Sequence, residues 1–165
     1  MMNTYSPPET YQQWLECFRH LQEHPLDQEM LKNLSRGRYL GKPSESFLVR
    51  MSDTLSVVIT LHCRRFLRQV DQALADGEAD MIPLLASRLK RHLNHCFFYR
   101  DVSFLDVTYI QNLDRGFGRQ LISFWQNFLA EMGKSARESM DAGLEDVYFE
   151  LKRMKFIPGG APVHE

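Results

Sequence analysis

The chain has 165 residues, of which 44% are hydrophobic, and its 20 lysines and arginines against 21 aspartates and glutamates leave a formal net charge of −1. This length fits one domain whose hydrophobic core is large enough to fold without disulfides or metal. The near-neutral balance excludes a protein drawn to DNA or anionic lipid by its overall field, so any nucleic-acid contact must come from a local patch.

The first segments predict two short helices. Ser6 as N-cap with Glu9 completing a capping box indicates a helix that begins near Ser6. This helix ends at His24, because the residue before Pro25 avoids helical backbone angles. A second, shorter helix is expected over 26–35.

Apolar residues then recur with a 3.6-residue period over 45–75, which predicts a long amphipathic helix with Ser44 as its cap. Its apolar stripe is about 120° wide, and His62 falls in the middle of that stripe. A helix over 80–98 follows, where Pro83 is tolerated because it lies in the first turn.

A second long helix is expected over 104–141, with Ser103 and Asp106 as a capping pair at its start. Gly116 and Gly118 lie inside it, and each costs about 1 kcal/mol relative to alanine in a helix interior. The pair therefore predicts either a kink or a close approach of another backbone. The last helix is expected over 143–156.

No run shows the alternation of a strand, so the sequence predicts an all-α fold of five to seven helices. We expect residues 1–156 to form a single helical domain and 157–165, rich in glycine and proline, to form a flexible C-terminal tail. The two long helices are expected to form a central antiparallel pair.

Cys17, Cys63 and Cys96 are odd in number and widely spaced, which is a poor disulfide framework. Each lies in an apolar, periodic segment, where a free cysteine behaves as a small hydrophobic residue. The first ten residues lack the basic and apolar regions of a signal peptide, and no apolar run is long enough to cross a bilayer. We therefore expect a cytoplasmic protein that does not bind membranes.

The stretch RLKRHLNHCFFYRD, residues 88–101, combines aromatic rings with cations. Consecutive rings point in different directions, so they cannot all face one core, and exposed rings beside arginine are typical of protein interfaces. We expect a partner chain to contact Arg91, Phe98, Tyr99 and Arg100. The alternative is that a second layer of helices covers the rings.

Three histidines are candidate ligand residues. His62, His92 or His95 could bind haem or a small ligand in a globin-like pocket, or His62 could be a core histidine with bonded ring nitrogens. His92 and His95 share a helix face, but Lys90 and Arg91 beside them would repel a divalent cation. No metal site is therefore predicted, and no cofactor is expected apart from the haem alternative.

Five cations form a local basic patch on the helices over 45–75 and 80–98: Arg64, Arg65, Arg68, Lys90 and Arg91. Such a patch could contact phosphates. Neighbouring acids dilute it, and no helix-turn-helix spacing is present.

No catalytic constellation is visible, because the acids Glu145, Asp146 and Glu150 follow the pattern of a solvated helix. We therefore expect a non-enzymatic protein-interaction module, such as a small bacterial adaptor, chaperone or regulator, that binds another protein chain or a second copy of itself. The alternatives are a nucleic-acid-binding regulator and a haem or small-ligand sensor.

Overall fold

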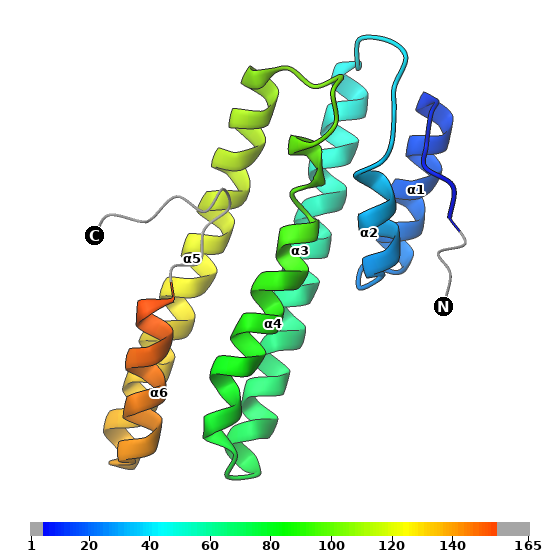
Figure 1. Ribbon diagram of the computed structural model, residues 1–165. Coiled ribbons are helices and arrows are strands. Elements are labelled where there is room, and N and C mark those ends of the chain that lie inside the picture. Colours follow the sequence, from blue (N-terminus) through cyan, green and yellow to red (C-terminus); the bar gives the residue numbers. More distant parts are fainter. Residues whose placement is uncertain (1–4, 155–165) are drawn as a thin grey trace. The chain divides into compact units, whose positions relative to one another are not determined.

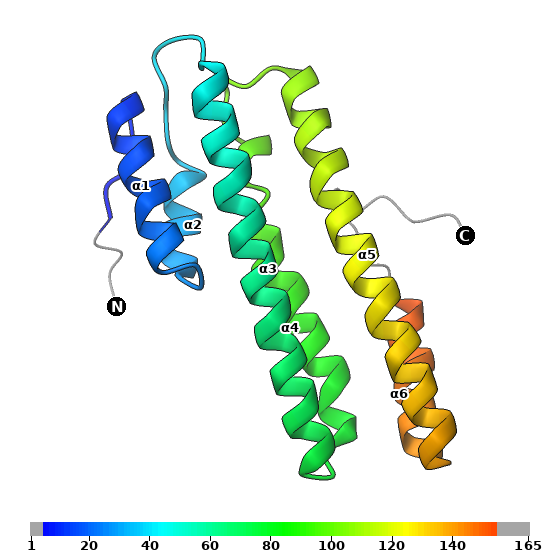
Figure 2. The same cartoon turned by 180° about the vertical axis from the view of Figure 1, so that it is seen from behind.

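The computed structural model describes residues 5–154, and these residues form helices and no strands (Figures 1 and 2). The prediction of an all-α fold is confirmed. The elements in chain order are α1 (Tyr11–Glu23), α2 (Gln28–Leu34), α3 (Glu45–Ala75), the 3₁₀ helix η1 (Ala79–Met81), α4 (Ile82–His95), the 3₁₀ helix η2 (Phe98–Arg100), α5 (Val107–Ser139) and α6 (Ala142–Arg153).

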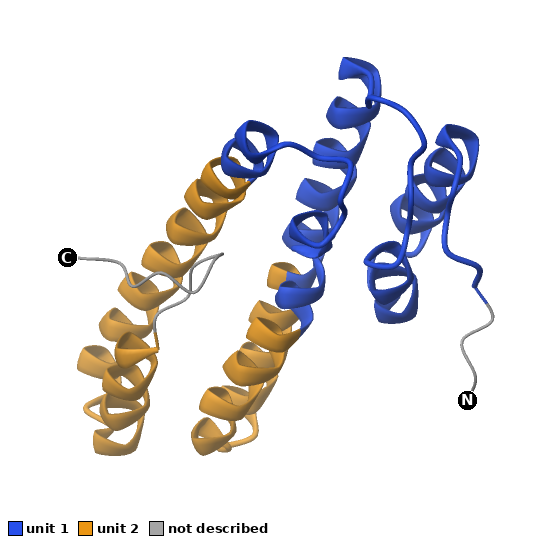
Figure 3. Ribbon diagram, turned by 45° about the horizontal axis from the view of Figure 1, so that its top comes forward, with its two compact units in different colours: residues 1–62, 92–113 blue, residues 63–91, 114–165 orange. Residues whose placement is uncertain are grey.

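The chain forms two compact units, shown in Figure 3. Unit 1 comprises residues 1–62 and 92–113, and unit 2 comprises residues 63–91 and 114–165. The helices α3, α4 and α5 each contribute one segment to each unit. The single domain expected over 1–156 stays a prediction, and the expected tail over 157–165 lies outside the described residues.

Ser44 caps α3 as expected, and of the capping pair expected for the second long helix Asp106 caps α5. The backbone N–H of Phe47 donates to Oγ of Ser44 at 3.1 Å, and that of Tyr109 donates to Oδ1 of Asp106 at 3.0 Å. Each bond satisfies one of the N–H groups that a helix start leaves without an intrahelical acceptor. The two long helices therefore begin close to where the sequence placed them.

The cap predicted for the first helix is wrong. Thr10, not Ser6, caps α1, because its side chain accepts from the N–H of Gln13 at 3.2 Å. The segment before it is held outside the helix by Pro8, which is buried and whose carbonyl accepts from the N–H of Arg38 at 2.7 Å. A tertiary hydrogen bond thus overrides the capping box.

Unit 1 is built around Trp14, a fully buried side chain on α1. Its indole N–H donates to the carbonyl of Arg38 at 2.7 Å, which satisfies the one polar group of the ring. Other aromatic rings surround it with centroids 5.5 to 6.1 Å away, in tilted, stacked and edge-to-face arrangements: Phe18, Phe47, Phe98 and Phe104. The indole therefore fixes the loop after α2 against α1.

In unit 2, α4 runs opposite to α3, α5 runs opposite to α4, and α6 runs opposite to α5 (Figures 1 and 2). The segments of α3 and α5 in this unit consequently run in the same direction. The expected antiparallel pairing of these two helices is wrong. They still share a core, because the ring of Phe66 on α3 lies 6.2 Å from Phe124 and 5.1 Å from Phe128 on α5.

The close backbone approach that was one of the two expectations for Gly116 and Gly118 is not found at Gly116. The helix α5 continues through both Gly116 and Gly118, and a Cβ atom added at Gly116 would meet nothing within 4 Å. At Gly133, by contrast, a Cβ atom would lie 3.1 Å from the ring of Tyr148 on α6. Gly133 therefore lets the Tyr148 ring of α6 pack close to α5.

Gly37→Ala tests the packing around the indole. The new Cβ atom would lie 2.4 Å from Cζ2 of Trp14, so we expect a loss of about 1–3 kcal/mol of stability from overpacking. Urea unfolding followed by circular dichroism measures it. Gly41→Ala is the matched control, because its nearest new contact is at 3.9 Å. Equal unfolding midpoints for the two variants would contradict the packing described.

Candidate functional site

The structure brings the three candidate histidines together in unit 1, around Gln28 of α2. The side-chain amide nitrogen of Gln28 lies 2.9 Å from Nε2 of His62 on α3, and its oxygen lies 2.5 Å from Nδ1 of His95 on α4. An amide nitrogen can only donate and an amide oxygen can only accept. Nε2 of His62 is therefore an acceptor, and Nδ1 of His95 carries a proton.

His92 completes this group, which we call the histidine network. Its ring stacks on that of His62 with centroids 5.6 Å apart and an angle of 20° between the planes. Only 3% of His62 is exposed. Its ring nitrogen faces a side chain, as the core-histidine interpretation expected.

The histidine network does not have the geometry of a metal centre. Among residues 5–154, no group of three or more histidines, cysteines, aspartates and glutamates is placed to hold a metal ion. A haem iron at His62 would have to displace the hydrogen bond from Gln28. The haem hypothesis stays a prediction, and no contact in the network favours it.

Burial lowers the pKa of His95, and the positive charges of Lys32 and His92 act in the same direction. Glu29 opposes them without reversing the shift. The surroundings of His95 therefore stabilise its neutral imidazole form.

A second cluster of titratable groups lies in unit 1, where Oδ2 of Asp27 accepts from the Tyr5 hydroxyl at 2.6 Å and lies 2.7 Å from Nε2 of His20. The hydrogen bond to Asp27 raises the pKa of Tyr5 to about 12. The other carboxylate oxygen caps α2 by accepting from the N–H of Met30 at 3.2 Å. Since Tyr5 and His20 share this acceptor, Asp27 fastens the N-terminal segment to α1.

The cysteines are free and buried, as expected. Burial raises the pKa of Cys63 to about 12 and, together with Glu16, that of Cys17 to about 11. A thiol reacts as its thiolate, so these two are poor nucleophiles at neutral pH.

The exposure expected for the rings of Phe98 and Tyr99 is wrong. Phe98 is 2% exposed and Tyr99 is 0% exposed, and the Phe98 ring stacks on Trp14 at 6.1 Å. The chain leaves α-helical geometry after α4 and continues as η2, which turns both consecutive rings inward. Arg100, half-buried with its guanidinium 5.1 Å from the centre of the Phe97 ring, and the exposed Arg91 stay candidates for partner contact.

The five predicted nucleic-acid residues all belong to unit 2 and are all exposed. Arg64, Arg65 and Arg68 lie on α3, and Lys90 and Arg91 lie on α4, which runs alongside α3 (Figures 1 and 2). All five side chains are therefore accessible to a phosphate backbone, and nucleic-acid binding stays a prediction.

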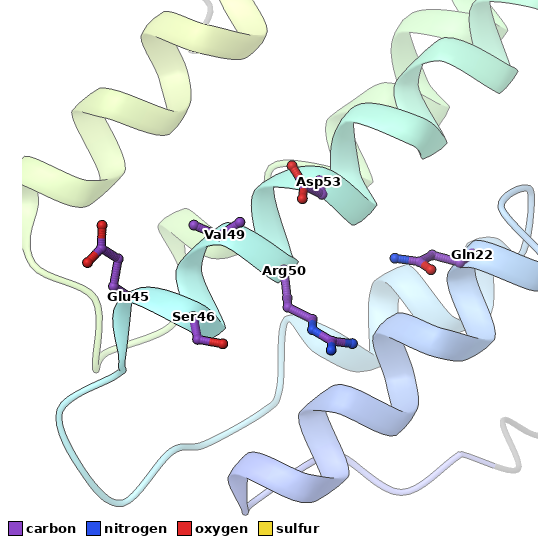
Figure 4. Close-up of a pocket in the computed structure, with 6 residues that line it drawn as sticks. All are labelled: Gln22, Glu45, Ser46, Val49, Arg50 and Asp53. Atoms are coloured by element: carbon purple, nitrogen blue, oxygen red, sulfur yellow. The ribbon is translucent and has the colours of Figure 1, made fainter.

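A polar pocket of about 570 Å³ lies in unit 1 along the first turns of α3. Figure 4 shows Arg50 and Gln22 directed toward the space between α3 and α1, whereas Glu45 and Asp53 project elsewhere from α3. The charged groups do not converge, so the pocket offers no site that would fix a charged ligand.

A more apolar groove of about 490 Å³ lies between α3 and α5 in unit 2, and we call it the α3–α5 groove. Six apolar side chains line it: Leu67, Val70, Leu74, Phe124, Phe128 and Met132. Among residues 5–154, the only charged residues that line it are the exposed Asp71 and Glu131. Sequence reasoning missed this groove, because its two walls belong to separate helices.

No protein-family model, no curated protein and no solved structure matches the chain. No helix in the described part of the chain is both long enough and apolar enough to cross a membrane.

The histidine network predicts that the folded protein loses stability as the pH falls. Because the pKa of folded His95 lies below its ordinary 6.5, the unfolded chain takes up the proton first as the pH falls. The contribution to stability is therefore complete above pH 6.5 and is lost as the pH falls through the folded value.

We expect His95→Gln to reduce the loss of stability between about pH 7.5 and pH 5.5 in urea unfolding, because glutamine does not titrate. His24→Gln, at an exposed position outside the network, is the control for the loss of a histidine as such. Parallel pH profiles for wild type and His95→Gln would contradict the assignment.

Proposed function

We propose that the chain is a non-enzymatic protein-interaction module that holds a helical segment of another protein in the α3–α5 groove. The observation that carries the proposal is an open apolar groove whose walls are two helix faces. On α3, Leu67, Val70 and Leu74 recur at i, i+3 and i+7, and Phe124, Phe128 and Met132 recur every fourth residue on α5. Amphipathic helices commonly bind such grooves through anchors of the same spacing.

The dimensions of the groove suit a short helix. At 1.5 Å per residue, the lining extends about 10 Å along α3 from Leu67 to Leu74 and about 12 Å along α5 from Phe124 to Met132. Two turns of a partner helix cover this length. Leu67 is 37% exposed, so the groove presents apolar surface to an incoming side chain.

The charges of the groove select the partner. Asp71 and Glu131 line it and no cation in the described part of the chain does, so lysine or arginine beside the apolar face of the partner is favoured. A second copy of this groove would bring carboxylates against carboxylates. We therefore identify the occupant as a cationic amphipathic helix of another protein.

A designed peptide tests the proposal. The probe is a fluorescent helix of about 14 residues with leucine on one face and lysine on the other. We expect it to bind in an anisotropy titration, and to bind more weakly as salt rises, because screening weakens exposed charge pairs. A peptide with the same leucines and glutamate in place of lysine should not bind.

Charge reversal of the groove is the decisive comparison. Asp71→Lys combined with Glu131→Lys should weaken binding of the leucine–lysine peptide about tenfold or more. Glu23→Lys combined with Glu138→Lys, at exposed positions outside the groove, is the matched control and should bind as wild type does. No binding, equal binding of both peptides, or an equal loss in both double variants would refute the proposal.

Nucleic-acid binding is the second candidate, favoured by the exposure of all five cations on α3 and α4. We expect a fluorescent single strand or duplex to bind at low salt, with an affinity that falls steeply as salt rises. Arg64→Gln with Arg68→Gln should lower both the affinity and the salt slope, whereas Arg19→Gln with Arg119→Gln should not. Absence of binding at low salt would eliminate this candidate.

A further inference from the structure

A second groove, of about 470 Å³, lies between α5 and α6 in unit 2, and we call it the α5–α6 groove. Gly133 and Ala136 of α5 line it together with Tyr148 and Phe149 of α6. None of these residues lines the α3–α5 groove, which uses other positions of α5. The two grooves are therefore separate surfaces of the same unit.

Two large apolar side chains are exposed at the α5–α6 groove. Met140, in the turn between the helices, is 90% exposed, and Phe149 is 53% exposed. Clustered exposed apolar side chains favour association with another molecule, because association removes their surface from water.

The backbone of Met140 has a conformation that is unusual for a methionine. Its φ of 52° lies in the left-handed region, which glycine adopts at a helix end without strain. A methionine here costs conformational energy and contributes little burial within the unit, since 90% of it is exposed. Burial of this side chain against another molecule would compensate for that conformational cost.

The charges at the α5–α6 groove distinguish it from the α3–α5 groove. Of the residues that the structure describes, one cation, Arg137 of α5, and one anion, Glu145 of α6, line it. In a two-fold interface, residue i of one copy contacts residue j of the other and the reverse. A surface with one charge of each sign is complementary to itself, whereas the acidic α3–α5 groove is not.

We propose that two copies of this chain associate through their α5–α6 grooves around a two-fold axis. Arg137 of each copy pairs with Glu145 of the other, and Met140 and Phe149 of each copy pack into the opposite groove. The interface uses no residue that lines the α3–α5 groove. A dimer would thus display two binding grooves and gain avidity for a partner with two helical segments.

Sedimentation equilibrium over a range of concentrations tests the proposal. We expect a reversible dimer in the wild-type protein, and Phe149→Asp should raise its dissociation constant about tenfold or more, because it places a charge against an apolar surface. Circular dichroism establishes that each variant is folded. A monomer at all concentrations, or a dimer unchanged by folded Phe149→Asp, would overturn the proposal.

A charge swap tests the pairing itself. Arg137→Glu and Glu145→Arg should each weaken the dimer, because each creates two like-charged contacts across the axis. The double variant should restore association to near the wild-type value, and so should a mixture of the two single variants, which an effect within one copy would not do. Glu138→Arg on the same helix, outside the groove, is the control and should change nothing.

Failure of the double variant to restore the dimer would refute the paired contact. The leucine–lysine peptide gives a separate readout, because its groove shares no lining residue with this interface. Loss of the dimer with peptide binding intact would refute only self-association.

Discussion

The buried face of α3 is the constraint on which both compact units depend. Its apolar stripe continues through the helix, with Phe47, Met51 and Leu55 buried in unit 1 and with Phe66 and Val70 buried in unit 2. A helix with such a stripe is stabilised mainly by packing against neighbours and only weakly by its own propensity. The elements that cover this stripe therefore define the cores of the two units.

The histidine network follows from the same constraint. His62 lies within the stripe and is turned inward with it, so the ring cannot reach solvent without moving its apolar neighbours. A buried imidazole is tolerated when its nitrogens are hydrogen-bonded, and Gln28 of α2 supplies that bond. The network is thus explained as the satisfaction of a polar side chain in a core, with acid sensitivity as its consequence.

The side chains that the helices leave outside their cores determine how the surface can interact. The α3–α5 groove combines apolar walls with two carboxylates, whereas the α5–α6 groove combines exposed apolar side chains with one charge of each sign. Burial of apolar area favours association at both surfaces, but it does not determine which partner binds. The charges determine which partner binds at each groove, because like charges across an interface are unfavourable and opposite charges fix its register.

The sequence by itself determined the features that depend on neighbours along the chain. Helix periodicity, the caps at Ser44 and Asp106 and the burial of the cysteines follow from side chains a few residues apart. Only the tertiary structure decided that Thr10 caps α1, that Phe98 and Tyr99 turn inward, and that α3 and α5 run in the same direction. The grooves and the histidine network belong to this second class as well. Each depends on which helices lie side by side, and the period of a single helix carries no information about its neighbours in space.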